Sequence, residues 1–223
     1  MNEPVKTILF CGFGRSGKDE AASFLGRITT LRYAGSFSWA GLPYMAHLLG
    51  MHPCEAWEKR HQMRDVWKRE LDHLRTLDQC CLARMVLQTG EIAAGLRDKV
   101  EIDAVKSEKL FDRIIWIHRP GTPVDPTVTY GPEDCDEQLC NDGTLEWFHY
   151  QLFEWAKANG LTFKDNAEYQ KISSLNKPWF FAHDLPNGAF ATKDSFTPLN
   201  VGPSPARVPF IPVIVKPFQV GNE

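Results

Sequence analysis

The stretch Gly12-Phe13-Gly14-Arg15-Ser16-Gly17-Lys18-Asp19 indicates which fold the chain adopts. It fits the pattern GxxxxGK at Gly12, Gly17 and Lys18. Glycines let the backbone curl so that successive N–H groups face one anion, and the N-terminus of a following helix adds about half a positive charge. The lysine of this pattern reaches the terminal phosphates of a nucleotide. The residue types therefore predict a phosphate-binding loop.

The segments on either side of the loop have the patterns that such a loop requires. Residues 6–11 (KTILFC) form a short apolar run with β-branched members, which predicts a buried strand. Residues 17–28 carry apolar side chains at helical spacing and predict a helix. A strand, a glycine loop and a helix in this order favour a phosphate loop. A glycine-rich turn without ligand is the alternative interpretation.

The rest of the first 160 residues alternates strand and helix patterns. Further strands are predicted at 31–35, 91–96 and 113–118, and helices at 39–49, at 53–88 in two or three pieces, and at 98–110. Thr144 can cap a last helix that Gly160 ends. Strands separated by helices predict an α/β fold with a parallel sheet of about five strands and helices on both faces, in three layers.

The composition of the chain argues against several classes of function. The chain has 43% hydrophobic and 24% charged residues, typical of a globular protein, and its net charge of −3 argues against strong nucleic-acid binding. It contains no apolar run of 18 residues, and its N-terminus lacks the layout of a signal peptide, so we expect no membrane partner. Six cysteines without a CxxC pair favour reduced thiols and a cytoplasmic location.

The last part of the sequence differs from the first. Most of the 15 prolines follow residue 119, which predicts many loops there. We divide the chain into a domain at 1–160 and a C-terminal extension at 161–223, because the family resemblance that the glycine-rich loop carries covers the chain only to about residue 160. The apolar segments 178–181 and 208–215 should pack on the core or on a second subunit, as in a homodimer. His183 beside Asp184 is interpreted as a structural histidine.

The loop, with Arg15 and with Asp19 after the lysine, resembles that of phage-type deoxynucleoside monophosphate kinases, and more broadly of nucleoside monophosphate and dephospho-coenzyme A kinases. The resemblance implies a P-loop NTPase fold, ATP and Mg²⁺ as cofactors, nucleotide substrates, and the host cytoplasm if the source is viral. Asp19 stands where Ser or Thr usually contacts Mg²⁺, and its carboxylate can serve the same hard cation. The expected donor-binding residues are Gly12, Gly14, Arg15, Ser16, Gly17, Lys18 and Asp19.

The resemblance also implies where catalytic cations lie. Arg97 and Glu101 match a family segment D-x-R-x-x-x-E that follows a strand, but Gly95 replaces its aspartate. The usual strand-end carboxylate is therefore missing, and Asp19 is its expected substitute for metal binding. Arg64 and its neighbour Arg69 lie in a region that resembles the acceptor-binding helices. Arg119 resembles a lid arginine, and with Lys18, Arg97 and Arg64 it completes the expected catalytic set.

Three further segments are assigned from the same resemblance. Phe37, Trp39 or Tyr44 could stack on a base, because they follow the second predicted strand. Residues 121–136 look like a lid insertion, and residues 140–146 resemble a turn beside the donor adenine. We expect a kinase that phosphorylates a (deoxy)nucleoside monophosphate. A kinase for another small acceptor and a non-catalytic nucleotide-binding protein are the alternatives.

Overall fold

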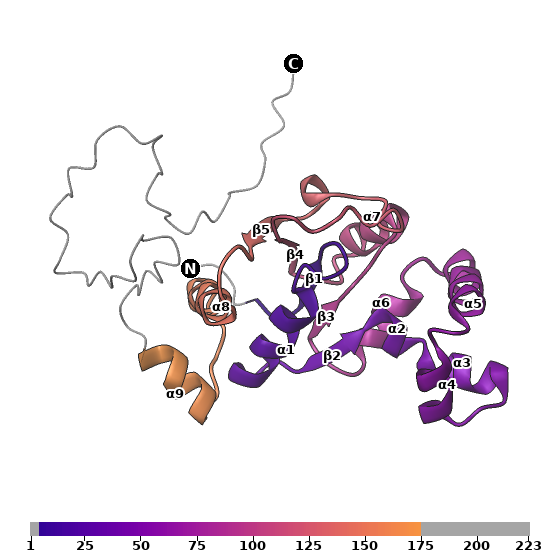
Figure 1. Cartoon of the computed structure of the whole chain (residues 1–223), viewed down its shortest axis with the longest axis horizontal. Coiled ribbons are helices and arrows are strands. Elements are labelled where there is room, and N and C mark those ends of the chain that lie inside the picture. Colours follow the sequence, from indigo (N-terminus) through magenta and orange to yellow (C-terminus); the bar gives the residue numbers. More distant parts are fainter. Residues whose placement is uncertain (1–4, 175–223) are drawn as a thin grey trace, which may run out of the picture.

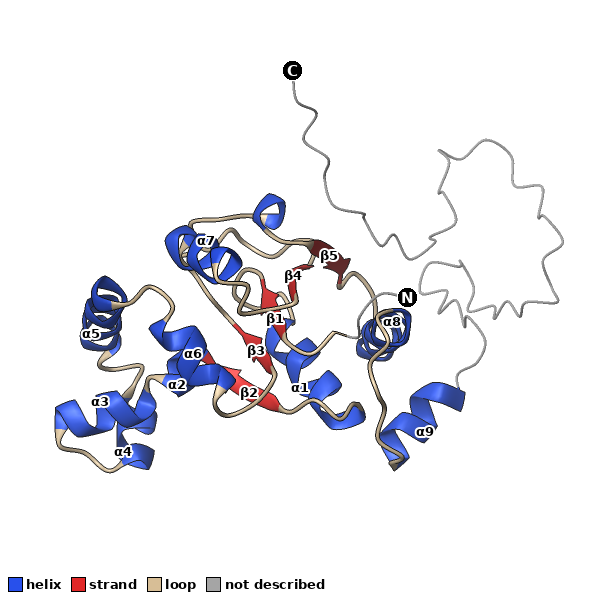
Figure 2. Ribbon diagram, turned by 180° about the vertical axis from the view of Figure 1, so that it is seen from behind, coloured by secondary structure: helices blue, strands red, loops and turns tan. Residues whose placement is uncertain are grey.

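A computed structural model describes residues 5–174 and shows an α/β fold built on one parallel sheet (Figures 1 and 2). The sheet has the order β2-β3-β1-β4-β5. Its strands are β1 (Ile8–Cys11), β2 (Tyr33–Ser36), β3 (Ile92–Ala94), β4 (Arg113–His118) and β5 (Glu137–Cys140). All pairings are parallel, with Ile8 of β1 opposite Ile92 of β3 and Arg113 of β4. The predicted five-stranded parallel sheet is confirmed.

Helices cover both faces of the sheet. One face carries α1 (Lys18–Ile28), α8 (Leu145–Ala158) and α9 (Ala167–Ser174). The helices on the other side are α2 (Phe37–Ala40), α3 (Leu42–Leu49), α4 (Pro53–Lys59), α5 (Arg64–Leu77), α6 (Cys81–Leu87) and α7 (Lys99–Ser107). A short 3₁₀ turn, η1, spans Pro132–Asp134.

Successive side chains of the buried strands point to opposite faces of the sheet and so belong to two hydrophobic cores, one on each face. In β1, Leu9 packs with the α2–α7 side, whereas Ile8 and Phe10 pack with α1 and α8. All four residues of β1 are buried, as expected for a central strand between two helical layers. The sheet thereby holds the loop after β1 on a rigid support.

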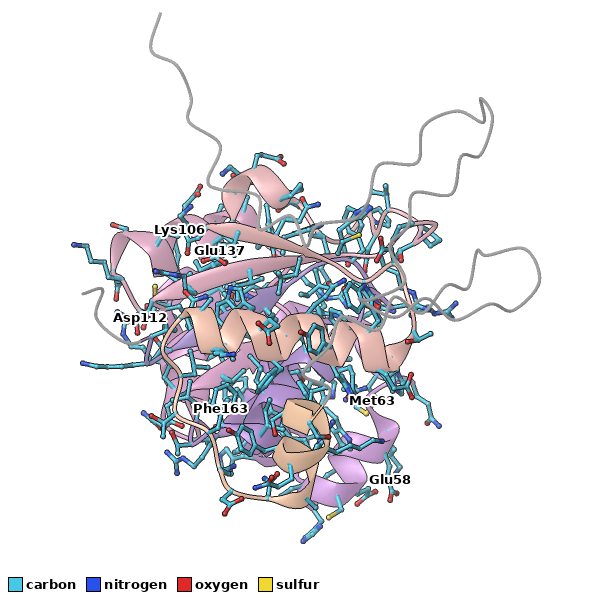
Figure 3. All side chains as sticks on the ribbon, turned by 90° about the vertical axis from the view of Figure 1, so that its left-hand side faces the viewer. Glu58, Met63, Lys106, Asp112, Glu137 and Phe163 are labelled. Atoms are coloured by element: carbon cyan, nitrogen blue, oxygen red, sulfur yellow. The ribbon has the colours of Figure 1, made fainter. Side chains whose placement is uncertain are left out.

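The predicted start of the last helix is confirmed. The Thr144 hydroxyl accepts a hydrogen bond from Trp147 N, so Thr144 is the N-cap of α8. Beyond α8, the chain returns along α1. Phe163, labelled in Figure 3, lies beside α8 and α9. Its ring stacks with Tyr169 at 5.3 Å between ring centroids, and Ile172 of α9 is buried in the same core.

Two local predictions differ from the structure. The helix predicted at 39–49 is two helices, α2 and α3, which meet at Gly41; a β-carbon there would lie 2.6 Å from Leu71 Cδ2. Strand β5 was not predicted. It lies at the sheet edge, and only Leu139 of its four residues is buried, so its sequence lacks a continuous apolar run.

Within 5–174, none of the helices has the length and apolar character needed to cross a membrane. The segments 178–181 and 208–215, His183 and Asp184 lie outside the described residues. The segment from 161 to 174 packs on α1 and α8, through the Thr29–Phe163 bridge and through Arg27, whose Nε lies 2.9 Å from Glu168 Oε2.

Candidate functional site

The loop of residues 12–18, here called the glycine loop, has the backbone shape that its sequence predicts. Gly12 has φ 141° and Gly17 has φ 99°, and Arg15 between them is left-handed at φ 67°. A β-carbon on Gly12 would lie 2.6 Å from Ile117 O, and one on Gly17 would lie 2.5 Å from Asn141 Nδ2. Glycine is required at both positions for φ and for space.

Asn141 holds the glycine loop from the opposite side. Its Nδ2 donates a 2.8 Å hydrogen bond to Ser16 O, and its backbone N donates to His118 O at 2.7 Å. Asn141 directly follows β5, so the ends of β4 and β5 are tied to the loop. The Ser16 side chain is buried, and its hydroxyl oxygen has no hydrogen-bond partner among the described residues. A buried hydroxyl of this kind beside a backbone cradle suits an anionic ligand.

Lys18 and Asp19 open α1 at the mouth of the loop. Lys18 Nζ lies 3.1 Å from Asp19 Oδ2, and the lysine side chain is largely shielded while the aspartate is exposed. Gly95, which stands where the family segment has aspartate, lies opposite Lys18: a β-carbon there would meet Lys18 Cε at 3.6 Å. This is an ordinary van der Waals distance, so space does not exclude a side chain at position 95, whereas the φ of 98° favours glycine there.

The central cleft is a cavity of about 380 Å³ that begins at Lys18 and Asp19. One wall is the end of β3 with the start of α7, and it contributes Gly95, Arg97 and Glu101. The opposite wall is one face of α5. Ligands of open parallel sheets bind at the carboxyl ends of the strands, where this cleft lies.

The α5 wall is basic because of its helical spacing. Arg64, Lys68 and Arg75 line the cleft at intervals of four and seven residues, which places them on one face of the helix. Arg60 lines the same cleft and lies 3.7 Å above the Trp57 ring. Partial burial lowers the pKa of Arg60. The wall therefore carries Arg60, Arg64 and Lys68 in the same cleft as Lys18, whereas the charge of Arg75 is paired with Asp72 and Glu101.

Arg97 is held by the segment that was interpreted as a lid. Its guanidinium donates to Asp125 Oδ2 at 3.0 Å and to the Thr127 hydroxyl. Burial acts to raise the pKa of Asp125, but hydrogen bonds from Thr127 and the charge of Arg97 outweigh it and lower that pKa. A β-carbon on Gly14 would lie 3.7 Å from Asp125 Oδ2. The segment around Asp125 therefore lies against the glycine loop.

Other predicted residues lie outside the cleft lining. Arg119 follows β4 and is exposed, and Arg69 points outward from α5 and pairs with Glu70. Phe37 is buried in the core, Trp39 packs edge-on against Trp57 at 4.8 Å, and Tyr44 is partly buried against the core. The structure thus brings Lys18, Asp19, Arg64 and Arg97 together and leaves Arg119 at the surface.

The sequence did not predict several residues that line the cleft, among them residues of α5. Trp67, Lys68 and Arg75 line it, and Arg75 Nε lies 2.9 Å from Glu101 Oε1. Arg75 has a raised pKa: burial acts to lower it, but the nearby Glu101 and Asp72 carboxylates outweigh burial. The signal that could have found these residues is the spacing from Arg64, which places all of them on the cleft face of α5.

Comparisons with known proteins add no family to this description. No family model matches the chain, and a search of curated proteins finds no match.

Proposed function

We propose that this chain is a P-loop kinase that transfers the γ-phosphoryl group of ATP to a nucleoside monophosphate, in the first place a deoxynucleotide. The observation that supports it best is the central cleft. It joins Lys18 beside the glycine loop to Arg97 and to the basic face of α5. A phosphate-binding loop that opens into a second cationic wall suits two phosphorylated substrates, one on each side.

The donor site is built from the glycine loop. Backbone N–H groups of residues 14–18 would hold the β- and γ-phosphates of ATP, and Lys18 would place its charge on the transferred group. The buried Ser16 hydroxyl, which has no partner within 5–174, is free to donate to a phosphate oxygen. Asn141 keeps the loop in shape through Ser16 O.

Mg²⁺ would accompany ATP, and Asp19 is the residue placed to hold it. Asp19 is exposed at the loop mouth beside Lys18, and a carboxylate is a suitable ligand for this hard cation. Across 5–174, no three His, Cys, Asp or Glu side chains group as a metal site. Mg²⁺ in nucleotide enzymes takes one or two carboxylates, with phosphate oxygens and water completing its shell. When bound, the ion neutralises charge on the phosphates.

The acceptor would place its phosphate between Arg97 and the α5 wall. A phosphate oxygen of the acceptor attacks the γ-phosphorus, the bond from that phosphorus to the β–γ bridging oxygen breaks, and ADP leaves. Negative charge spreads over the transferred group, so fixed cations lower the barrier. Arg64 and Lys68 orient the acceptor, while Lys18 and Arg97 act on the transferred group once Arg97 is released from Asp125.

The test is a transfer assay with purified protein, Mg·ATP and a panel of ribo- and deoxynucleoside monophosphates. We expect ADP and one nucleoside diphosphate to form together, and Lys18→Ala to reduce the rate at least about a thousandfold because it removes charge stabilisation in the transition state. Lys157→Ala is the matched control, since Lys157 is an exposed lysine on α8 outside the cleft.

The outcomes separate the alternatives. ATP binding without turnover of any monophosphate would overturn the proposal. Transfer to a different phosphorylated metabolite would then identify a kinase with another acceptor. If wild type and Lys18→Ala bind ATP and neither transfers its phosphoryl group, the chain is a nucleotide-binding protein without kinase activity.

A further inference from the structure

An ionic contact ties the segment around Asp125 to the central cleft. Arg97 lines the cleft, and its Nη1 donates to Asp125 Oδ2 at 3.0 Å and to the Thr127 hydroxyl. That hydroxyl donates in turn to Asp125 Oδ1 at 2.6 Å, and Thr127 N donates to the same oxygen at 3.0 Å. The three side chains therefore form a closed network, in which Oδ1 of the carboxylate is held by Thr127 and Oδ2 is held by Arg97.

The same carboxylate lies beside the glycine loop. A β-carbon on Gly14 would lie 3.7 Å from Asp125 Oδ2, which is an ordinary contact distance. Backbone N–H groups of a loop of this kind attract an anion. A carboxylate and a phosphate are alternative partners for a guanidinium, since both accept hydrogen bonds from its N–H groups. The Asp125 carboxylate thus has the charge, the arginine partner and the position that a phosphate oxygen on this loop would have.

The contact between Arg97 and Asp125 is built so that it can be exchanged. The Asp125 side chain is 20% exposed and the Arg97 side chain is 47% exposed. A partly exposed ion pair contributes little net stability, because water can replace either partner. Next to the pair, Thr129 N donates to Arg97 O at 2.9 Å, and the hydroxyl of the buried Tyr130 donates to Leu96 O at 2.8 Å. These bonds hold the base of the segment in place when the ion pair breaks.

Resting on the donor site of the proposed function, we propose that the Asp125 carboxylate holds the place of a donor phosphate between Arg97 and the glycine loop. When ATP binds, a phosphate oxygen takes over the Arg97 guanidinium, and Asp125 is released to water. No covalent bond forms or breaks in this exchange. Asp125 is therefore a positioning residue. It keeps Arg97 beside the loop before the nucleotide arrives, and it lowers the affinity for ATP because its contact with Arg97 must first be broken.

Calorimetric titration of the full chain with ATP, in the absence of an acceptor, tests this exchange. In Asp125→Asn, the amide oxygen should face Thr127, whose two contacts both donate, so that the NH₂ group replaces Oδ2 and cannot accept from Arg97. The variant should bind ATP about two- to fivefold more tightly than wild type, the range expected for release of a partly exposed ion pair. Asp125→Ser, whose hydroxyl can also accept from Thr127 N, should show the same gain.

Two further comparisons separate the exchange from a general effect of charge. Arg97→Ala removes the exchanged cation, and in this background Asp125→Asn should change the affinity for ATP by less than about twofold. Asp103→Asn removes an exposed carboxylate that pairs with Lys99 at 3.1 Å and lies outside the cleft lining, so it should bind ATP as wild type does. A circular dichroism spectrum like that of wild type shows that each variant is folded.

Binding measured without an acceptor keeps this inference apart from the kinase proposal. Tighter ATP binding in Asp125→Asn that depends on Arg97 supports the exchange, even if no phosphoryl group is transferred. Unchanged or weaker ATP binding by the folded Asp125 variants overturns it, even if wild type is an active kinase. An equal gain in Asp103→Asn, or a gain that persists in full without Arg97, also overturns it. Absence of measurable ATP binding by wild type does the same.

Discussion

At the scale of single residues, Asn141 connects segments 125 positions apart in the chain. Its amide nitrogen satisfies the Ser16 carbonyl, which lies within the tightest part of the glycine loop. The Ser16 carbonyl lies before the start of α1 and takes no part in the backbone hydrogen bonds of that helix. The loop shape therefore depends on a side chain that the local sequence around it does not contain.

We expect Asn141→Ala to lower the free energy of unfolding by about 1–3 kcal/mol, because it leaves the Ser16 carbonyl unpaired and buried. Affinity for ATP should fall as well, since the loop loses its support. Gln170→Ala is the matched control: it removes a 2.5 Å hydrogen bond from a side-chain amide to Asp165 Oδ1 at an exposed site. Urea unfolding and ATP titration measure both effects. Equal losses in the two variants would contradict this role of Asn141.

Glu101 is the second residue with an unusual setting. Burial raises its pKa, and the opposing charge of Arg75 does not cancel that effect. A group that binds its proton more tightly when folded gives stability that is fully present below its unfolded pKa and is lost as pH rises through its folded pKa. The relevant window starts near pH 4.5, the ordinary value for glutamate, and extends upward.

Glu101→Gln should therefore remove one component of the pH dependence of stability. Urea midpoints measured from pH 4 to pH 8 should fall more steeply with rising pH in wild type than in the variant, within the window above about pH 4.5. The difference between the two proteins is the quantity to follow, because all other groups titrate in both. Parallel curves for the two proteins would contradict a raised pKa at Glu101.

At the scale of elements, α5 combines two functions on one face. Trp67 and Leu71 are its buried residues, and they fix the helix against the core. The same spacing places Arg64, Lys68 and Arg75 along the cleft. The helix backbone places the Cα atoms of these residues along the cleft before a ligand binds, which lowers part of the cost of ordering them on binding.

We expect Arg64→Ala and Lys68→Ala each to raise the KM for the acceptor monophosphate about tenfold and to change the KM for ATP little, because each loses a charge-assisted contact to the acceptor phosphate. Arg69→Ala is the control on the same helix, since its side chain is 72% exposed and points away from the cleft. Steady-state kinetics with each substrate varied in turn measures the KM for the acceptor and the KM for ATP separately. An equal rise of the acceptor KM in Arg69→Ala would contradict specific contacts from Arg64 and Lys68. It would mean that the loss of any positive charge on α5 weakens acceptor binding.

At the scale of the whole molecule, the sheet unites two separate cores. Leu9 belongs to the core under α2–α7, and Phe10 belongs to the core under α1 and α8. Both are fully buried neighbours on β1. The glycine loop continues from this strand, so the two cores together fix the position of the site.

Leu9→Ala and Phe10→Ala should each destabilise the protein by about 2–5 kcal/mol, through lost burial and a residual cavity. Because both cores share β1, unfolding followed by near-UV and far-UV circular dichroism should give coincident transitions in each variant. Leu77→Ala, at a side chain left exposed on α5, should change stability by less than about 0.5 kcal/mol. Separate transitions for the two probes would show that the faces unfold independently.

Local sequence was sufficient for the central strands and their connections. Residues 8–11, 92–94 and 114–117 are buried apolar runs, and the helices between them follow from periodic spacing. The sequence did not predict edge strand β5, because only Leu139 of its four residues is buried. It also did not predict the break between α2 and α3 at Gly41, because this break depends on close packing against Leu71. Such features depend on partners distant in the chain.

The sequence by itself determined the parallel α/β architecture and the positions in the glycine loop that can take positive φ, since this freedom at Gly12 and Gly17 is a local property of glycine. The hydrogen bond from Asn141 that holds the loop was decided by tertiary structure. Tertiary structure alone decided which positively charged side chains line the same cleft as Lys18. It brought Arg64 and Arg97 to one cleft with Arg75, and it left Arg119 and Arg69 exposed outside it. The physical reason is that convergence in space follows from how strands and helices pack, whereas residue type and spacing act only within one element.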